Sequence, residues 1–230
     1  ADELEAEQGR RPVVVVDNTI LGPIGQTPLR HGADIAVYSL TKYIGGHSDL
    51  IGGAAMGSDA MMAPVRKLRS GMGTNLDPNT CWMLARSLET VKLRMEAAFN
   101  GAREVAEFLK GHGKVEKVRY LGFLEPGTRD HEVHHRQAGE GCYGSTFAFD
   151  VAGGQEAAFR MLNQLKVLKL AVSLGGTETL ICHPGSTTHA AVAPELQERC
   201  GFTPGLVRVS VGIENPDDLI ADLDQALEHA

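Results

Sequence analysis

Val13-Val14-Val15-Val16-Asp17 is the first of two stretches that decide the fold. The second is Ile35-Ala36-Val37-Tyr38, which is followed by Ser39-Leu40-Thr41-Lys42. Each is a short apolar run that ends at polar side chains. About one helix's worth of residues separates the runs, which is typical of a βαβ unit with two parallel strands. In such a unit both strands end on the same edge of the sheet, where α/β proteins bind ligands. We therefore expect Asp17 and Lys42 to face one crevice.

These residue types match what a pyridoxal 5′-phosphate (PLP) enzyme requires. A lysine bonds covalently to that cofactor, an acid pairs with its pyridinium nitrogen, and small donors such as Ser39 and Thr41 hold its phosphate. Plainer interpretations remain open, because a lone lysine is usually a solvated charge and an acid after a strand often caps a turn. Lys42 differs from a typical surface lysine in following a buried strand and two hydroxyl residues and in preceding a glycine loop.

Composition excludes several classes of protein. The net charge of −7 and the lack of a basic stripe argue against a nucleic-acid partner. No apolar stretch approaches the roughly 18–20 residues that span a membrane. The four cysteines lack metal-binding or redox spacing, which favours reduced thiols in a cytoplasmic protein. A chain of 230 residues holds one large domain or two small ones.

The rest of the chain alternates helical and strand patterns. A helical pattern runs from about 79 to 110, and Asn100-Gly101 is expected to divide it. We place a domain boundary there, giving residues 1–99 and 100–230. Because parallel strands are covered on both faces, the first strand is expected to be central. Further strands are expected at 50–56, 115–120, 145–151, 169–173 and 206–211, helices at 60–69, 155–165 and 216–229, and a polar loop at 125–141.

Arg208 interrupts the apolar run Leu206–Val211. A charge within such a strand is costly to bury unless it is paired. It predicts either a bidentate grip on a substrate carboxylate or an edge strand with the arginine in water. Ser173 precedes Gly175-Gly176. It is expected either to contact the same substrate carboxylate as Arg208 or to be an ordinary loop residue.

One motif points elsewhere. His131-Glu132-Val133-His134-His135 fits the HExxH zinc signature, which requires a helix and a third ligand. It follows a Pro-Gly turn, so we expect a surface loop and no metal site.

Several segments together resemble the Cys/Met metabolism family of PLP enzymes, which includes cystathionine γ-synthase, cystathionine lyases, methionine γ-lyase and homoserine-ester sulfhydrylases. The similarity runs in order along essentially the whole chain. Its most specific part is Ser39-Leu40-Thr41-Lys42-Tyr43 with Gly45-Gly46-His47-Ser48-Asp49, and it includes the segments at 17–19, 32–34, 86–95, 173–180, 183–189 and 208–214.

The resemblance implies an α/β fold of the aspartate-aminotransferase type, with part of the large PLP-binding domain followed by a small C-terminal α/β domain. Lys42 is implied to hold PLP and to move protons, and Asp17 to pair with the pyridinium nitrogen. Ser39 and Thr41 are implied to bind the phosphate. Arg208, helped by Ser173, is implied to bind the carboxylate of a small amino-acid substrate.

Relative to that family, the first part, of over a hundred residues that supply part of the active site, is expected to be absent from this chain. The missing half is expected to be a separate polypeptide, or the chain is a truncated product. The family implies a homo-oligomer, usually a dimer of dimers, or an assembly with a chain that supplies that half. Val172, where members that handle cystathionine tend to carry glutamate, favours γ-elimination from methionine or a homoserine derivative. Open alternatives are γ-replacement and a non-catalytic fragment.

Overall fold

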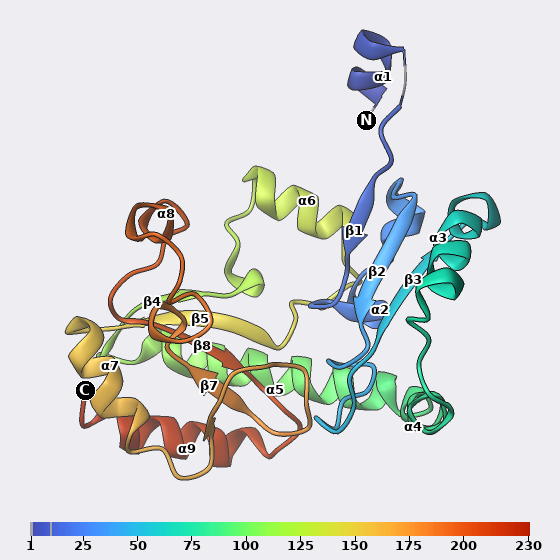
Figure 1. Cartoon of the computed structure of the whole chain (residues 1–230). Coiled ribbons are helices and arrows are strands. Elements are labelled where there is room, and N and C mark those ends of the chain that lie inside the picture. Colours follow the sequence, from blue (N-terminus) through green and yellow to red (C-terminus); the bar gives the residue numbers. More distant parts are fainter. Residues whose placement is uncertain (1, 10) are drawn as a thin grey trace. The chain divides into compact units, whose positions relative to one another are not determined.

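The computed structural model describes residues 2–9 and 11–230. The chain divides into two compact units, which are described separately (Figure 1). Unit 1 holds the residues up to Lys92 together with Val133–Cys142, and unit 2 holds Leu93–Glu132 and Tyr143–Ala230. The domain division expected at residues 99 and 100 stays a prediction.

Unit 1 is built on a three-stranded sheet in the order β1-β2-β3. Strand β1 (Val15–Asp17) runs parallel to β2 (Ile35–Ser39), and β3 (Gly53–Gly57) runs antiparallel to β2. The parallel pairing is confirmed. The connection between β1 and β2 differs from the expected helix, because it holds only the short turns α2 (Gly22–Gly25) and a 3₁₀ helix at Pro28–His31.

The expectation that β1 is central is wrong for the described sheet, because β1 forms one of its edges. Val15 is accordingly 55% exposed. The sheet of unit 1 carries a small core of Ala36, Tyr38, Ile44, Leu50 and Leu84.

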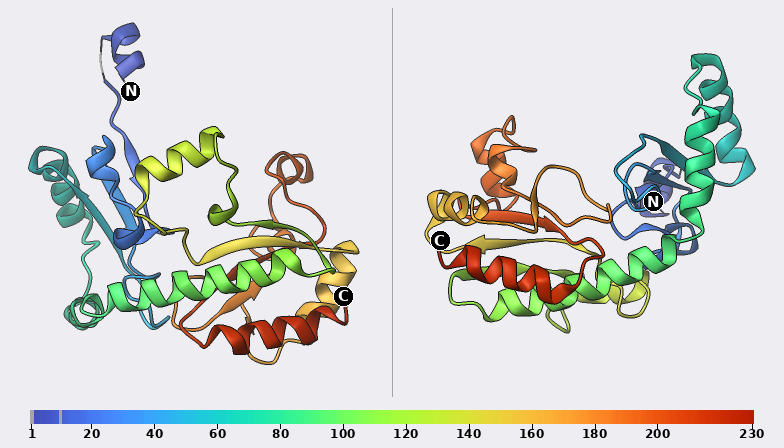
Figure 2. Two further views of the ribbon diagram at one scale, coloured as in Figure 1. Left: turned by 180° about the vertical axis from the view of Figure 1, so that it is seen from behind. Right: turned by 90° about the horizontal axis from the view of Figure 1, so that it is seen from below.

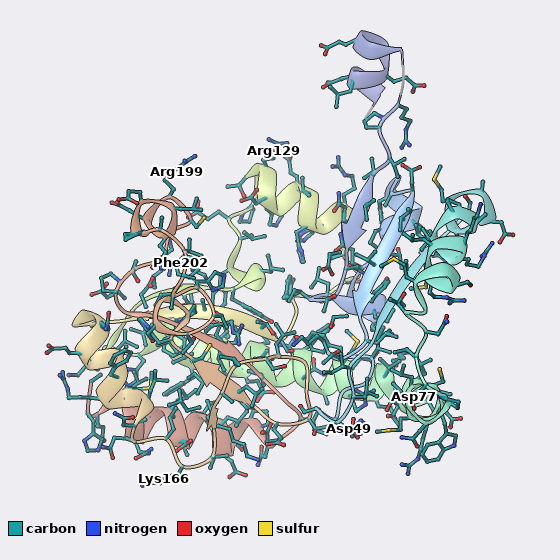
Figure 3. All side chains as sticks on the ribbon, in the orientation of Figure 1. Asp49, Asp77, Arg129, Lys166, Arg199 and Phe202 are labelled. Atoms are coloured by element: carbon teal, nitrogen blue, oxygen red, sulfur yellow. The ribbon has the colours of Figure 1, made fainter. Side chains whose placement is uncertain are left out.

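The helices of unit 1 begin at well-formed caps. Ser58 accepts a hydrogen bond from the Met61 amide at the start of α3 (Asp59–Met72). Asp77, which is labelled in Figure 3, accepts one of 3.0 Å from the Thr80 amide at the start of α4 (Pro78–Leu88). Helix α1 (Asp2–Gln8) precedes the sheet.

Unit 2 contains a five-stranded sheet in the order β4-β5-β8-β7-β6. Only the β6–β7 pair is parallel among its described neighbours. Strand β8 is interior, so Arg208 does not lie on an edge strand. The strands are β4 (Val115–Arg119), β5 (Thr146–Val151), β6 (Lys169–Leu170), β7 (Leu180–Cys182) and β8 (Leu206–Ser210).

One face of this sheet forms the main core. Side chains alternate along a strand, so Phe147 and Phe149 share a face with Val207 and Val209, and all four are buried. Three helices pack their apolar faces into the same core: α5 (Val91–Gly111), α7 (Gly154–Leu162) and α9 (Pro216–Leu227). The views of Figures 1 and 2 show α5 and α9 running along the same side of the strands. Arg208 is thereby placed on the opposite face.

Two helical expectations are wrong. The long helical pattern breaks after Leu88, between α4 and α5, and α5 continues through Asn100 and Gly101. Gly101 is buried, and a β-carbon there would make an ordinary van der Waals contact with Val211 at 3.5 Å, so the helix continues through this position without interruption. Residues 125–141 are not all loop, because α6 (Arg129–Gln137) forms within them.

Three short elements complete the described chain: α8 (Pro194–Arg199) and 3₁₀ helices at Leu121–Phe123 and Pro184–Ser186. Within residues 2–9 and 11–230, every helix is too short or too polar to cross a bilayer.

Candidate functional site

The carboxyl end of β1 presents Asp17 as an exposed side chain. Its Oδ1 atom accepts a 2.9 Å hydrogen bond from the Thr19 amide, which fixes the direction of the carboxylate. The Oγ1 atom of Thr19 in turn accepts a 2.8 Å hydrogen bond from the Ser39 amide. Thr19 therefore connects the acid at the end of β1 to the end of β2.

Asn18 anchors the same turn from inside. Its side chain is buried, and Nδ2 lies 2.9 Å from the carbonyl oxygens of Gly22 and Gln26 and 3.0 Å from the Tyr38 hydroxyl. Two carbonyl oxygens can only accept, so they fix the orientation of the amide. The chain after β1 is thereby held against β2, and Asp17 cannot swing away with a loose loop.

A tight turn positions the root of Lys42 directly after β2. The Lys42 amide donates to the Ser39 carbonyl at 3.2 Å, and the Gly46 amide donates to the Lys42 carbonyl at 2.7 Å. A β-carbon at Gly45 would lie 2.7 Å from the Leu40 carbonyl oxygen, so the turn requires glycine there. Because the backbone on both sides is hydrogen-bonded, Lys42 extends from a fixed point.

The two predicted phosphate donors differ in their surroundings. The Thr41 hydroxyl accepts a 3.1 Å hydrogen bond from the Gly52 amide and lies 3.4 Å from the Gly52 carbonyl. The half-buried Ser39 hydroxyl has no partner among the described residues. Ser39 thus has the freer hydroxyl for an anion, while Thr41 also holds the following loop in place.

Unit 2 brings Arg208 and Ser173 together. The Nη2 atom of Arg208 donates a 2.7 Å hydrogen bond to the Ser173 carbonyl. The Nε atom of Arg208 is buried without a partner in the described chain. Ser173 has φ of +99°, a backbone conformation that favours glycine. A guanidinium with a fixed direction and an unpaired donor suits a carboxylate ligand.

The structure therefore groups the predicted residues into two sets. Asp17, Ser39, Thr41 and Lys42 follow the carboxyl ends of two parallel strands in unit 1. Ser173 and Arg208 form the second set, in unit 2. The first set offers an exposed acid, an unpaired hydroxyl and a lysine, and this chemistry fits PLP. Sequence reasoning assigned no role to Thr19, although a hydroxyl residue two positions after the acid was a visible signal.

An ion pair holds the other end of β1. The Arg11 guanidinium lies 2.7 Å from Oδ2 of Asp34, and the Val14 amide donates to the same oxygen at 2.8 Å. The Val14 amide and the Arg11 side chain both favour the charged carboxylate, so they lower the pKa of Asp34. This pair fixes the starts of β1 and β2, as Thr19 fixes their ends.

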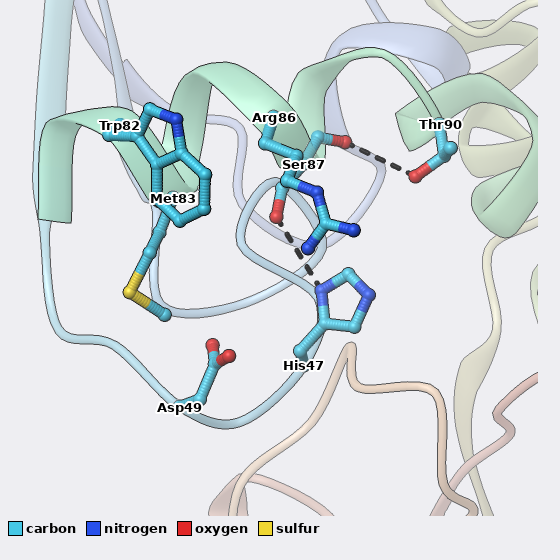
Figure 4. A pocket seen from close by; sticks show the side chains of 7 residues that line it. All are labelled: His47, Asp49, Trp82, Met83, Arg86, Ser87 and Thr90. Atoms are coloured by element: carbon cyan, nitrogen blue, oxygen red, sulfur yellow. Dashed lines mark hydrogen bonds between the residues drawn. The ribbon is translucent and has the colours of Figure 1, made fainter. Parts of the chain in front are cut away.

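Two cavities are lined by described residues of unit 1, and Lys42 is in the wall of neither. The first, of about 330 Å³, is drawn in Figure 4 and is lined by His47, Asp49, Trp82, Met83, Arg86, Ser87 and Thr90. The second, of about 320 Å³, lies beside the Arg11–Asp34 pair, with Arg11, Gln26, His31 and Gln137 in its wall.

The HExxH segment is helical, contrary to expectation. His131 and His135 are one turn apart on α6. Across residues 2–9 and 11–230, however, His, Cys, Asp and Glu side chains do not gather in any group of three that would hold a metal ion.

Comparison with known proteins gives a consistent result. The model of the family described as Cys/Met metabolism PLP-dependent enzyme matches residues 4–228. L-methionine gamma-lyase of Fusobacterium nucleatum subsp. polymorphum is 44% identical over 219 residues, covering 94% of this chain and 54% of that protein. Cystathionine gamma-lyase of Bacillus subtilis (strain 168) is 39% identical over 219 residues, covering 94% of this chain and 56% of that protein.

Solved structures agree. The crystal structure of cystathione gamma lyase (CalE6) from Micromonospora echinospora superposes with a TM-score of 0.89 and 37% identity, covering 98% of this chain and 58% of that chain. The likeness confirms the expected α/β fold of the aspartate-aminotransferase type. The chain spans about half the length of the curated relatives it matches, 54% and 56% for the two above.

Proposed function

Because the chain belongs to the Cys/Met metabolism PLP-dependent enzyme family, we propose that it is part of an enzyme that removes the γ-substituent of methionine or of a homoserine derivative. The observation that carries the proposal is the parallel β1–β2 pair, whose carboxyl ends lead into Asp17 and into Ser39 to Lys42. Parallel strands that end together support a site in which an acid, hydroxyls and a lysine share one edge of the sheet.

In this proposal Lys42 bonds PLP and carries a proton to and from the substrate. Asp17 faces the pyridinium nitrogen and keeps it protonated, and the Thr19 amide holds the carboxylate in that direction. The Ser39 and Thr41 hydroxyls contact the phosphate. When bound, PLP supplies an electron sink that stabilises the charge left after a proton leaves the substrate α-carbon.

Arg208 takes the role of the carboxylate-binding residue. Its Nη2 atom is already held by the Ser173 carbonyl, and its buried Nε donor still requires an acceptor. A planar carboxylate meets that requirement and gains two parallel hydrogen bonds from one guanidinium. Ser173 contributes through the backbone carbonyl that orients Arg208.

The substrate preference follows from a single position and from the relatives. Val172 is 52% exposed and adds no charge beside Ser173. This favours an uncharged substrate tail such as that of methionine. The relatives named L-methionine gamma-lyase support elimination. O-succinylhomoserine sulfhydrylase of Pseudomonas aeruginosa, at 35% identity over 223 residues, keeps γ-replacement as the second candidate.

We propose that the working enzyme is cytoplasmic and homo-oligomeric, a dimer of dimers or an assembly with a chain that supplies the remainder of the family's length. A non-catalytic fragment or subunit that requires a second chain is the alternative from another class. This chain matches only about half of the length of each relative, which supports the proposal that further residues are needed to complete the enzyme.

The first test is the visible absorption of the purified chain after PLP is added. A yellow band that borohydride abolishes, with the cofactor's mass fixed on the Lys42 peptide, would support the proposal. Lys42→Ala should lose the band, whereas Lys67→Ala, in the exposed part of α3, should keep it. A band that persists in Lys42→Ala would contradict the role of Lys42.

If the chain alone binds no PLP, the same titration is repeated after co-expression with the first half of a relative. Elimination and replacement are then separated by assaying 2-oxo acid and ammonia with and without a thiol acceptor. Formation of a thioether product in place of the 2-oxo acid and ammonia when the thiol is added would favour replacement.

A further inference from the structure

The cavity of about 330 Å³ in unit 1, named here the α4 cavity, has two walls. One is a single face of α4 and the residues just after it, because positions 82, 83, 86, 87 and 90 recur at helical spacing. The other is the loop that carries His47 and Asp49. Ser48, between those two residues, has φ of +57°, which is uncommon for a residue other than glycine. That conformation sends the chain around so that both neighbours line the cavity.

The imidazole of His47 ties the loop to the helix. Its Nδ1 atom lies 2.7 Å from the Gly45 carbonyl and 3.5 Å from the hydroxyl of Ser87, which is buried on α4. A carbonyl only accepts, so Nδ1 carries the hydrogen. The two walls of the cavity therefore approach each other at His47 and Ser87, within unit 1.

Two opposite charges line the α4 cavity without neutralising each other. Among the described residues, neither the Arg86 guanidinium nor the Asp49 carboxylate has an ion pair or a side-chain hydrogen bond. Figure 4 draws the two groups well apart, with the carboxylate on the side of the Met83 thioether. The cavity thus offers a separated cation and anion.

The remaining wall is apolar. Trp82 is 61% exposed although it is large and apolar, and the thioether of Met83 lies with it in the cavity wall. Indole and thioether surfaces attract aliphatic and sulfur-containing groups. A volume of about 330 Å³ is at the lower end of the roughly 300–1,000 Å³ typical of small-molecule sites.

We infer that the α4 cavity binds a free α-amino acid with an aliphatic or thioether side chain. Arg86 binds the carboxylate, Asp49 binds the ammonium group, and Trp82 with Met83 covers the side chain. A simple anion would be repelled by Asp49 and a simple cation by Arg86, so the pair selects a zwitterion. Lys42 is not in the cavity wall, and the inference does not rest on the proposed function.

Trp82 makes the test direct, because it is the only tryptophan in the chain. The emission of the PLP-free full chain is titrated with L-norleucine, which has no γ leaving group. A saturable change in emission is expected. Hexanoate lacks the ammonium group and pentylamine lacks the carboxylate, so each should bind about tenfold more weakly or worse, as expected for a lost charge-assisted contact.

Matched variants assign the ligand to the cavity. Arg86→Met and Asp49→Asn should each weaken binding about tenfold or more, whereas Arg69→Met, an exposed arginine in the last turn of α3, should not. Circular dichroism checks that the variants fold. If Arg86→Met unfolds, Arg86→Lys keeps the charge, loses the bidentate geometry and should bind with reduced affinity.

The Lys42→Ala variant distinguishes binding in the α4 cavity from binding at the proposed catalytic site. Its tryptophan emission should respond to L-norleucine as that of the parent chain does. The inference is overturned if no saturable change occurs or if Arg86→Met titrates unchanged. A response that is lost in Lys42→Ala and kept in Arg86→Met would place the ligand at Lys42. That result would overturn the second site while leaving the proposed function intact.

Discussion

The Nη2 atom of Arg208 donates a 2.7 Å hydrogen bond to the backbone carbonyl of Ser173, a residue whose φ is +99°. The contact uses the backbone of Ser173, so the direction of the guanidinium depends on where this strained residue places its carbonyl. The amide of Gly175 donates at 3.0 Å to the Ser210 hydroxyl, which ties the same loop to β8 a second time. The loop that contains Ser173 and Gly175 is therefore hydrogen-bonded to two residues of β8, Arg208 and Ser210.

Ser173→Gly should therefore stabilise the chain by up to about 1 kcal/mol, because glycine adopts a positive φ without the penalty of a β-carbon. Urea unfolding monitored by circular dichroism measures the change. The control is Ser70→Gly, within α3, where glycine should cost about 0.5 kcal/mol. A destabilised Ser173→Gly would mean that the side chain, rather than the carbonyl, supports the loop.

Thr19→Val should lower the free energy of unfolding by about 1–3 kcal/mol, because the part-buried Ser39 amide loses its 2.8 Å acceptor. Thr19→Ser keeps the hydroxyl and should stay within about 1 kcal/mol of the parent chain. Thermal and urea unfolding of the three proteins make the comparison. Equal losses in both variants would show that the methyl group, not the hydrogen bond, matters.

Asp222→Asn should cost about 2–4 kcal/mol of folding free energy. The buried carboxylate of Asp222 accepts hydrogen bonds of 2.7–3.1 Å from the amides of Lys166, Val167 and Leu168. Lys166 is labelled in Figure 3. An asparagine replaces one acceptor oxygen with a donor and leaves buried N–H groups unpaired.

The control for that change is Asp224→Asn on the same helix. Asp224 is 57% exposed in its salt bridge with His112, so its loss should cost less than about 1 kcal/mol. Similar unfolding midpoints for the two variants would contradict the importance of the Asp222 contacts.

Tyr120→Phe should make the chain more resistant to alkali. Burial raises the pKa of Tyr120 to about 12, and its hydroxyl has no hydrogen-bond partner in the described chain. An unfolded tyrosine ionises near pH 10, so the native state loses stability as pH rises from about 10 towards 12. The variant lacks this loss and should gain up to about 2 kcal/mol relative to the parent over that window.

The stability difference between the parent chain and Tyr120→Phe, followed from pH 8 to pH 11, is the measurement. Phe123, Tyr143 and Phe147 pack around Tyr120 with ring centroids 5.3–6.0 Å away, so the ring itself should keep its place. A difference that does not change with pH would refute the raised pKa.

Local patterns were sufficient to predict the parallel pair and its polar ends, because short apolar runs bounded by Asp17 and Ser39 have few other interpretations. The interior position of Arg208 was left open, since only pairing with β5 and β7 distinguishes an interior strand from an edge. The α4 cavity was not predicted, because it joins a loop to a helix some forty residues later, as the 40-residue separation of His47 and Ser87 shows.

Helix α6 was missed for a different reason. Pro126 and Gly127 were treated as breakers of a helix, whereas they precede its start. Thr128 caps it, since its hydroxyl accepts from the His131 amide at 3.3 Å. Acids in the first turn and basic residues in the last also favour the helix dipole. Strand β7 (Leu180–Cys182) was missed as well.

The exposed edge of β1 has a practical consequence for anyone who handles the isolated polypeptide. An open strand edge beside the exposed Val13 and Val15 is a template on which another molecule adds its own strand. Mutual repulsion from the net charge of −7 opposes such stacking, and it vanishes near the isoelectric point of about 5.7. Purification in mildly alkaline, low-salt buffer should therefore give the highest yield, and acidic elution should cause precipitation.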